Sequence, residues 1–215
     1  AATWRWTTSE LFNRIHPPSD MSSFRSWVDA ARPRTLPLAV TCVLLGGALA
    51  KALGLNEEQD ARFVLVMLGA GLTVVLLQIL ANFANDLGDF QKGTDIAAVR
   101  TDRALASGAL TESSMKRAVK SMAILAFISG IGTLFAAFAG APSAAMTAFA
   151  LGVLGVFSIV AAMRYTMGRK SYGYKGLGDF YVMLFFGPVG VLGVGTLLTH
   201  TCLLYTSDAA DDVRG

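Results

Sequence analysis

Two asparagines and two aspartates stand at the end of an uncharged stretch that covers residues 63–85: Asn82, Asn85, Asp86 and Asp89. On a helix that advances about 100° per residue, their side chains fall within roughly one third of the circumference. The negative dipole at a helix C-terminus disfavours carboxylates, so a cation should offset them, and hard oxygen ligands suit Mg²⁺. We therefore expect Asp86 and Asp89 to bind Mg²⁺ on a face that points into a central cavity. The alternative is a solvated helix terminus, because Asn and Asp are common at helix ends.

The composition is that of an integral membrane protein. Of the 215 residues, 53% are hydrophobic and 15% are charged, against about 25% charged in soluble domains. A membrane span needs about 20 apolar residues. Such stretches cover residues 36–55, 63–85, 121–163 and 180–201, and the Gly140-Ala141-Pro142-Ser143 break divides the third into two helices. We expect an all-α, polytopic transmembrane bundle with five helices, the third starting near Thr111 and Glu112.

The loops alternate in charge. By the positive-inside rule, the N-terminus and both basic loops face the cytoplasm of a multi-pass protein in the inner (plasma) membrane. The basic residues that set this orientation are Arg25, Arg32 and Arg34 before the first span, Lys92, Arg100, Arg103, Lys116, Arg117 and Lys120 after the second, and Arg164, Arg169, Lys170 and Lys175 after the fourth.

Both cytoplasmic loops could recognise a polyanion. The loop after the second span mixes acids and bases, among them Lys92, Asp95 and Arg103. Carboxylates can bind Mg²⁺, Mg²⁺ can bind phosphate, and Arg or Lys can neutralise the remaining charge. The loop after the fourth span is rich in Gly, Tyr and cations, and its candidate binding residues are Lys170, Tyr174 and Lys175. Topology alone could also place these cations and tyrosines at a membrane surface.

Four ordered segments carry a family resemblance. The stretch from Asn82 to Asp95, Asn-Phe-Ala-Asn-Asp-Leu-Gly-Asp-Phe-Gln-Lys-Gly-Thr-Asp, resembles the first Asp-rich motif of the UbiA-type membrane prenyltransferases, in particular their 1,4-dihydroxy-2-naphthoate polyprenyltransferase branch. The others are Ala31-Arg32-Pro33-Arg34-Thr35-Leu36-Pro37, Asp102-Arg103-Ala104-Leu105-Ala106-Ser107-Gly108 and Tyr172-Gly173-Tyr174-Lys175-Gly176-Leu177-Gly178-Asp179. Ala104 and Ala106 stand where the wider superfamily often has proline.

The resemblance implies transfer of a polyprenyl chain from polyprenyl diphosphate to 1,4-dihydroxy-2-naphthoate, with release of diphosphate and CO₂. It implies Mg²⁺ on Asp86 and Asp89, with Arg103 and Lys92 stabilising the leaving group. Residues that would contact the substrates are Asn82, Asn85, Asp95, Tyr174, Lys170 and Lys175. The partners would be the two substrates and the lipid bilayer, with no nucleic acid.

The same resemblance leads us to expect a C-terminally truncated, inactive chain, because the family has eight or nine helices and a second Asp-rich motif. We expect residues 24–200 to be the N-terminal part of the prenyltransferase domain. Residues 1–23 would be a non-native or disordered extension, and residues 201–215 a non-native tail. The alternatives are another UbiA-type aromatic prenyltransferase or, in a different class, an ion-coupled membrane transporter. The last is disfavoured because its acids should lie near the middle of the bilayer.

Overall fold

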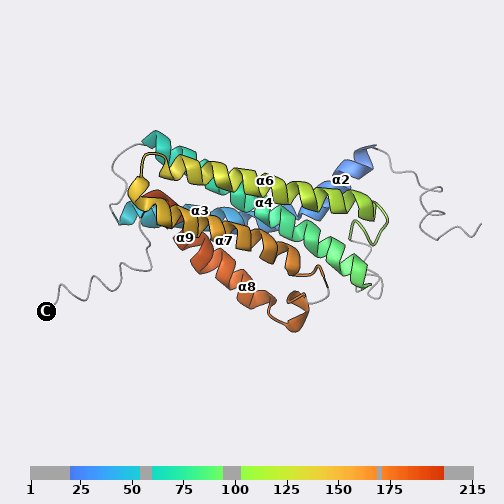
Figure 1. Ribbon diagram of the computed structural model, residues 1–215. Helices are drawn as coiled ribbons and strands as arrows, with labels where there is room; N and C mark the ends of the chain where they lie inside the picture. The colour runs from blue at the N-terminus through green and yellow to red at the C-terminus, as the bar shows by residue number, and fades with distance from the viewer. Residues whose placement is uncertain (1–19, 54–59, 94–102, 169–170, 201–215) are drawn as a thin grey trace, which may run out of the picture.

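A computed structural model describes residues 20–53, 60–93, 103–168 and 171–200, and every regular element in these ranges is helical (Figure 1). The expected all-α class is confirmed. The elements are α2 (Asp20–Ala31), η1 (Pro33–Thr35), α3 (Leu36–Ala52), α4 (Asp60–Lys92), α6 (Glu112–Phe138), η2 (Pro142–Ala144), α7 (Ala145–Arg164), η3 (Gly173–Lys175), α8 (Gly178–Leu184), η4 (Phe185–Val189) and α9 (Gly190–Thr199).

Five helical stretches in the described part of the chain are long and apolar enough to cross a membrane, as expected. Their outer surfaces carry many exposed large apolar side chains, such as Leu68, Phe135 and Phe149. In water such a surface would promote association, whereas a bilayer solvates it. The chain is therefore a multi-pass membrane protein. The five stretches are Phe24–Ala52, Ala61–Lys92, Glu112–Phe138, Pro142–Arg164 and Gly178–Thr199.

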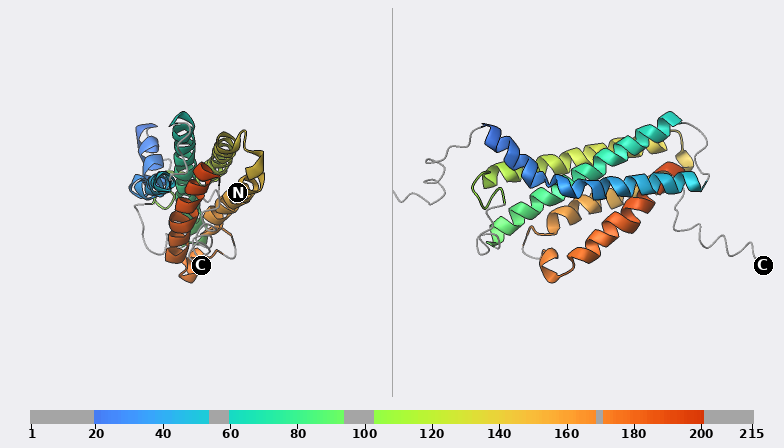
Figure 2. Two further views of the ribbon diagram at one scale, coloured as in Figure 1. Left: turned by 90° about the vertical axis from the view of Figure 1, so that its left-hand side faces the viewer. Right: turned by 180° about the vertical axis from the view of Figure 1, so that it is seen from behind.

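The helices form an elongated bundle in which α4 packs mainly against α6, and α3 against α9 (Figures 1 and 2). One apolar cluster, which includes Leu80 and Met115, lies toward the end where α4 finishes and α6 begins. A second, which includes Val66 and Val194, lies toward the opposite end. Because sequential helices run up and down the bundle, the segments that follow α4 and α7 meet at the same end.

Local sequence signals set the helix boundaries. The Thr111 side chain accepts a hydrogen bond from the backbone N–H of Ser114, which is the N-cap expected for α6. Gly140 adopts a positive φ of 81° between α6 and α7, a conformation that glycine reaches without strain. The helix α4 runs further than the apolar stretch predicted, so the whole Asn82–Asp89 motif is helical.

The last membrane stretch bends at η4, where Pro188 lacks an N–H and Gly187 has non-helical angles. The thiol of Cys42 in α3 donates to the Phe186 carbonyl at 2.9 Å. A carbonyl at a break in a membrane helix needs such a partner from a neighbouring helix. At the end away from the motif, Arg62 of α4 similarly donates to the carbonyls of Ala136, Ala137 and Ala139 where α6 ends.

Close packing of α3 on α9 depends on Gly46, and this makes a prediction about stability. A Cβ at Gly46 would lie 2.7 Å from the Val191 carbonyl oxygen and from Val194 Cβ, whereas a Cβ at Gly71 would meet nothing within 4 Å. We expect Gly46→Ala to lower the free energy of unfolding in detergent by about 1–3 kcal/mol. The matched control, Gly71→Ala, should leave it unchanged or slightly raised. Equal midpoints of thermal unfolding for the two variants would contradict this packing.

Candidate functional site

Near the end of α4, the residues of its polar face make two kinds of contact. Asn82 and Asn85 line a cavity between the helices, whereas Asp86 and Asp89 are not among its lining residues and instead contact Arg103. The expectation that this face lines a cavity holds for the asparagines, whereas the aspartates are not among the residues that line this one. Both carboxylates instead contact the Arg103 guanidinium, which comes from the turn that precedes α6.

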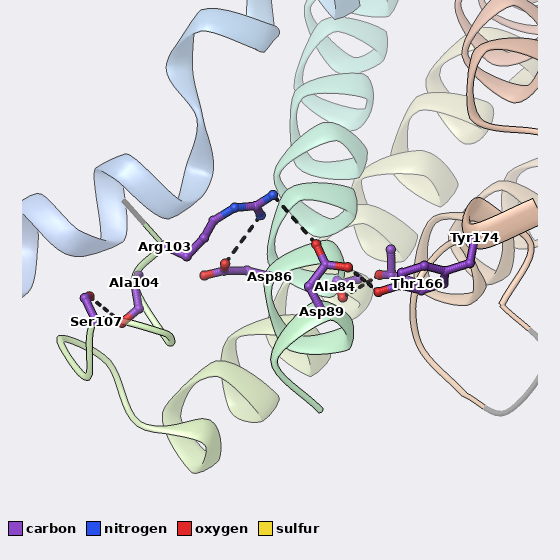
Figure 3. Close-up of polar contacts among 8 residues, drawn as sticks. All are labelled: Ala84, Asp86, Asp89, Arg103, Ala104, Ser107, Thr166 and Tyr174. Carbon is purple, nitrogen blue, oxygen red and sulfur yellow. Dashed lines mark hydrogen bonds and ion pairs between the residues drawn. The ribbon is translucent and has the colours of Figure 1, made fainter. Parts of the chain in front are cut away.

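The guanidinium of Arg103 bridges the two carboxylates (Figure 3). One of its terminal nitrogens lies 3.5 Å from Asp86 Oδ1 and the other 3.7 Å from Asp89 Oδ2. The side chain of Asp86 is only 2% exposed, and those of Arg103 and Asp89 are each 13% exposed. A carboxylate this deeply buried needs a charged partner, and the planar fork of arginine can serve two acids at once.

A compact turn holds Arg103 in place. The Ser107 N–H donates to the Arg103 carbonyl at 2.9 Å, and the Leu110 N–H donates to the Ala104 carbonyl at 3.0 Å. Gly108, with a positive φ of 75°, permits the tight reversal. Ala104, Leu105 and Leu110 are buried in the apolar cluster beneath the turn. These apolar anchors, rather than the ion pairs alone, fix the backbone that presents Arg103.

Side-chain contacts join the segment between α7 and α8 to the end of α4. The Tyr174 hydroxyl donates to Asp89 Oδ1, and Lys92 Nζ donates to Ser171 Oγ (Figure 3 draws the first of these contacts). Lys92 Nζ also lies 4.0 Å from the centroid of the Tyr174 ring, in cation–π geometry. Asp89 thus has Arg103 on one oxygen and Tyr174 on the other.

The end of α7 packs directly on the motif. The Thr166 hydroxyl is buried and donates to the Ala84 carbonyl at 2.9 Å (Figure 3). Thr166 can come this close because α4 has no side chain at Gly88: a Cβ there would lie 2.7 Å from Thr166. The glycine in the motif therefore sets the distance between α4 and the segment that carries Tyr174.

The two asparagines bind the corner between α2 and α3. The Asn82 amide donates to the Ala31 carbonyl at 2.8 Å and to Thr35 Oγ1 at 3.1 Å. With its amide oxygen oriented by the hydrogen-bond network, Asn85 accepts from both terminal nitrogens of Arg32 at 3.1 and 3.2 Å. Arg32 has a left-handed φ of 51°, which is rare for a residue with a side chain. Such a conformation at a site of converging polar groups marks Arg32 as a functional candidate.

The cavity has a volume of about 430 Å³ and is mostly apolar. Near the motif its wall carries the polar groups of Arg32, Asn82 and Asn85, and further along α4 it carries the apolar residues Leu77 and Val74. Three tyrosines from the α7–α8 region also line it: Tyr165, Tyr172 and Tyr181.

These tyrosines form a continuous aromatic wall. The ring centroids of Tyr165 and Tyr172 are 5.4 Å apart, and those of Tyr172 and Tyr181 are 4.1 Å apart. Burial, together with the neighbouring Tyr181 and Tyr165, raises the pKa of Tyr172 to about 12. The Tyr172 hydroxyl therefore stays protonated at neutral pH, which fits its donation to the Ala161 carbonyl at 2.7 Å. The wall is neutral and can stack against a planar ring.

The structure brings together most of the residues expected at the site. Asp86, Asp89, Arg103, Tyr174 and Lys92 form one connected set of contacts. Within the ranges that the structure describes, no group of three or more His, Cys, Asp or Glu side chains could hold a metal ion. Asp86 and Asp89 are therefore two candidate ligands and do not by themselves form a complete metal site. Asp95, Lys170 and the side chain of Lys175 lie outside the described residues.

Sequence reasoning missed four contributors: Arg32, Thr35, Thr166 and Ser171. Each contacts α4 from a segment distant in the sequence. One signal was available for Arg32, because it is a basic residue directly before Pro33, where the proline ring disfavours a helical conformation. The other three are small polar residues without a spacing pattern.

Curated proteins of known function resemble this chain in sequence. A 1,4-dihydroxy-2-naphthoate octaprenyltransferase of Haemophilus influenzae is 40% identical over 181 residues, which are 82% of this chain and 55% of that protein. Its namesake in Escherichia coli is 39% identical over 184 residues, 85% of this chain and 56% of that protein. A UbiA prenyltransferase domain-containing protein 1 of Dictyostelium discoideum is 28% identical over 194 residues, 90% of this chain and 56% of that protein.

The chain therefore belongs to the UbiA-type membrane prenyltransferases. Within them it is similar to the 1,4-dihydroxy-2-naphthoate octaprenyltransferases. It spans about half the length of the curated relatives it matches. No family model matches the chain. No solved structure matches it either.

The contact between Tyr174 and Asp89 predicts how firmly the α7–α8 segment is held. Tyr174→Phe removes the hydroxyl and keeps the ring beside Lys92, so the segment should lose one charge-assisted hydrogen bond worth about 1 kcal/mol or more. Amide hydrogen exchange in residues 171–176 should become several-fold faster. Tyr181→Phe is the matched control, because its hydroxyl makes no hydrogen bond within the described residues. Equal exchange in both variants would show that the Tyr174 hydroxyl does not hold the segment.

Proposed function

We propose that this protein transfers a polyprenyl group from polyprenyl diphosphate to 1,4-dihydroxy-2-naphthoate, giving demethylmenaquinol, diphosphate and CO₂. The observation that carries the proposal is the position of the Asp86–Arg103–Asp89 cluster. On α4 it lies within about two turns of Asn82 and Asn85, which line a mostly apolar cavity. A polyprenyl diphosphate has the same division into a charged head and an apolar chain. The choice of 1,4-dihydroxy-2-naphthoate as the acceptor rests on the names of the relatives.

The charged cluster suits a diphosphate. Asp86 and Asp89 supply oxygen ligands one helical turn apart, which fits the common mode in which Mg²⁺ is held by one or two carboxylates and by substrate phosphates. When bound there, Mg²⁺ would neutralise charge on the diphosphate. Arg103 and Lys92 would add fixed positive charge as the leaving group develops. Tyr174 would keep Asp89 oriented throughout.

The cavity suits the carbon chemistry. The bond between the allylic carbon and the diphosphate oxygen breaks, and the pair of electrons leaves with diphosphate. The electron-rich ring then attacks the allyl cation, the new carbon–carbon bond forms, and the ring carboxyl group leaves as CO₂. The apolar walls exclude water that would otherwise capture the cation. The tyrosine wall offers a surface for the naphthalene ring.

The basic loops favour an orientation with the charged cluster at the cytoplasmic face of the inner (plasma) membrane. Both substrates would then reach the site from that side, the diphosphate with its chain in the bilayer. A different aromatic acceptor is the second candidate, since the aromatic wall would accept other rings. An ion-coupled transporter is disfavoured, because the described acids Asp86 and Asp89 lie near the end of α4.

Incubation of the protein, at the full length that its gene encodes, with radiolabelled polyprenyl diphosphate, the naphthoate and Mg²⁺ tests the proposal. We expect label in the prenylated quinol and release of CO₂ in equal amounts. Label transferred only to another aromatic acid would identify a different acceptor. Absence of transfer, with ion-coupled uptake in vesicles, would reject the enzyme.

The aspartates and Arg103 give a graded prediction. Asp86→Ala and Asp89→Ala should each lower the turnover number by about 10²–10³-fold or more, because each removes a ligand and leaves Arg103 partly unpaired. The turnover number of Arg103→Lys should fall less than that of either alanine variant, because a lysine ammonium keeps the positive charge. It should still fall, because lysine does not present a planar fork to both carboxylates. Circular dichroism should show an unchanged helix content. Near-normal turnover of both alanine variants at saturating Mg²⁺ would refute the role of the cluster.

A further inference from the structure

The polar stripe on α4 extends deeper into the bundle than the aspartate motif. Gln78, Asn82, Asn85 and Asp89 follow one another at spacings of four, three and four residues, which keeps them on one side of the helix. Gln78 lines the cavity together with the two asparagines. It lies about 10 Å along the helix axis from Asn85, at 1.5 Å per residue.

Gln78 differs from the other members of the stripe in its contacts. The amides of Asn82 and Asn85 are bound to the α2–α3 corner, whereas the Gln78 amide makes no hydrogen bond to any residue that the structure describes. Several of its neighbours on the cavity wall are apolar, among them Leu77, Val74 and Ala81. An amide without a partner in an apolar environment costs about 1–3 kcal/mol. A polar side chain that faces the interior of a membrane bundle is a candidate binding group.

We propose that Gln78 is a specificity-determining residue that binds the 4-hydroxyl of the naphthoate acceptor. This inference rests on the proposed function and extends it to one atom of the substrate. An amide offers both a donor and an acceptor, and a ring hydroxyl can use either. The alternative, an ordered water on Gln78, would give no preference among acceptors.

The orientation follows from the charges along the cavity wall. The acceptor carboxylate prefers the motif end, where the Arg32 guanidinium lines the cavity. The 1-hydroxyl is adjacent to that carboxylate and forms an internal hydrogen bond with it. Only the 4-hydroxyl then needs a partner from the protein. A planar ring with a hydrogen bond at each end bridges a distance comparable to the two helical turns between Asn85 and Gln78.

The aromatic wall supports the same placement. Tyr165, Tyr172 and Tyr181 line the cavity that Gln78 enters from α4, so a ring held between them would have its face on the tyrosines and its edge toward the amide. Beyond Gln78, the lining that α4 contributes from Val74 to Ala70 includes one polar residue, Thr73. Its hydroxyl already bonds to the Gly69 carbonyl and to Ser129 Oγ, so this part of the wall suits hydrocarbon.

A comparison of two ligands and two variants tests the inference. Dissociation constants of 1,4-dihydroxy-2-naphthoate and of 1-hydroxy-2-naphthoate, which lacks only the 4-hydroxyl, are measured without donor and under anaerobic conditions, with the full-length protein in nanodiscs. We expect the wild type to prefer the dihydroxy compound by about tenfold, as one hydrogen bond allows. Gln78→Met, which preserves the size of the side chain, should reduce this ratio to about one while leaving the affinity for 1-hydroxy-2-naphthoate unchanged.

The matched control is Leu77→Met, which alters the same cavity wall without removing an amide and should keep the tenfold preference. In turnover assays Gln78→Met should raise KM for the naphthoate and leave KM for the polyprenyl diphosphate unchanged. An unchanged ratio in Gln78→Met, or equal weakening of both ligands, would overturn the role of Gln78. Equal binding of the two compounds by the wild type would overturn it while leaving the proposed function standing. Binding of neither compound would overturn both.

Discussion

The bridge from Arg103 to Asp86 and Asp89 is the interaction on which the site depends. Two carboxylates one turn apart, near the C-terminal end of a helix, repel each other and oppose the helix dipole. A single guanidinium offsets both effects, and it is held by a turn whose apolar residues are buried below it. Removing the cation would leave the buried Asp86 in an environment that disfavours its charged form. The charged contact joins the turn to the end of α4, and Asp89 extends the connection to the α7–α8 segment through Tyr174.

Beside this bridge, the polar face of α4 meets two environments, one charged and one largely apolar. Asp86 and Asp89 contact Arg103, whereas Asn82 and Asn85, on the same polar face of α4, line the cavity. Charged and apolar parts of a ligand can then be bound next to each other without placing an ionised side chain against hydrocarbon, which would be costly. Thr166 and Gly88 keep the two environments in contact, because they fix how closely the end of α7 approaches α4.

Much of the fold could be predicted because its signals are local. Apolar length indicated the membrane helices, Thr111 marked the start of α6, and the glycine and proline around residue 140 marked its end. The side to which Asp86 and Asp89 turn could not be predicted, since it depends on a residue 14 positions beyond Asp89 whose place is set by tertiary packing. Arg32 was missed for a related reason: its left-handed backbone and its contact with Asn85 belong to the tertiary structure, and no spacing rule encodes them.

The length of α4 has a consequence for the protein's sensitivity to its lipids. Its 33 residues exceed what a hydrocarbon layer of about 30 Å requires. A nearly upright helix with Arg62 at one interface would reach the opposite interface at about Asn82. The two aspartates would then stand among the headgroups, and Gln78 would remain within the acyl region. The length of α4 would thus set the depth of the charged cluster within the headgroup region. In a thicker bilayer of longer-chain lipids, the cluster would move toward the hydrocarbon or α4 would become more upright. In a thinner bilayer, α4 would tilt further. Bilayer thickness would therefore influence how far the charged cluster is exposed to the aqueous phase.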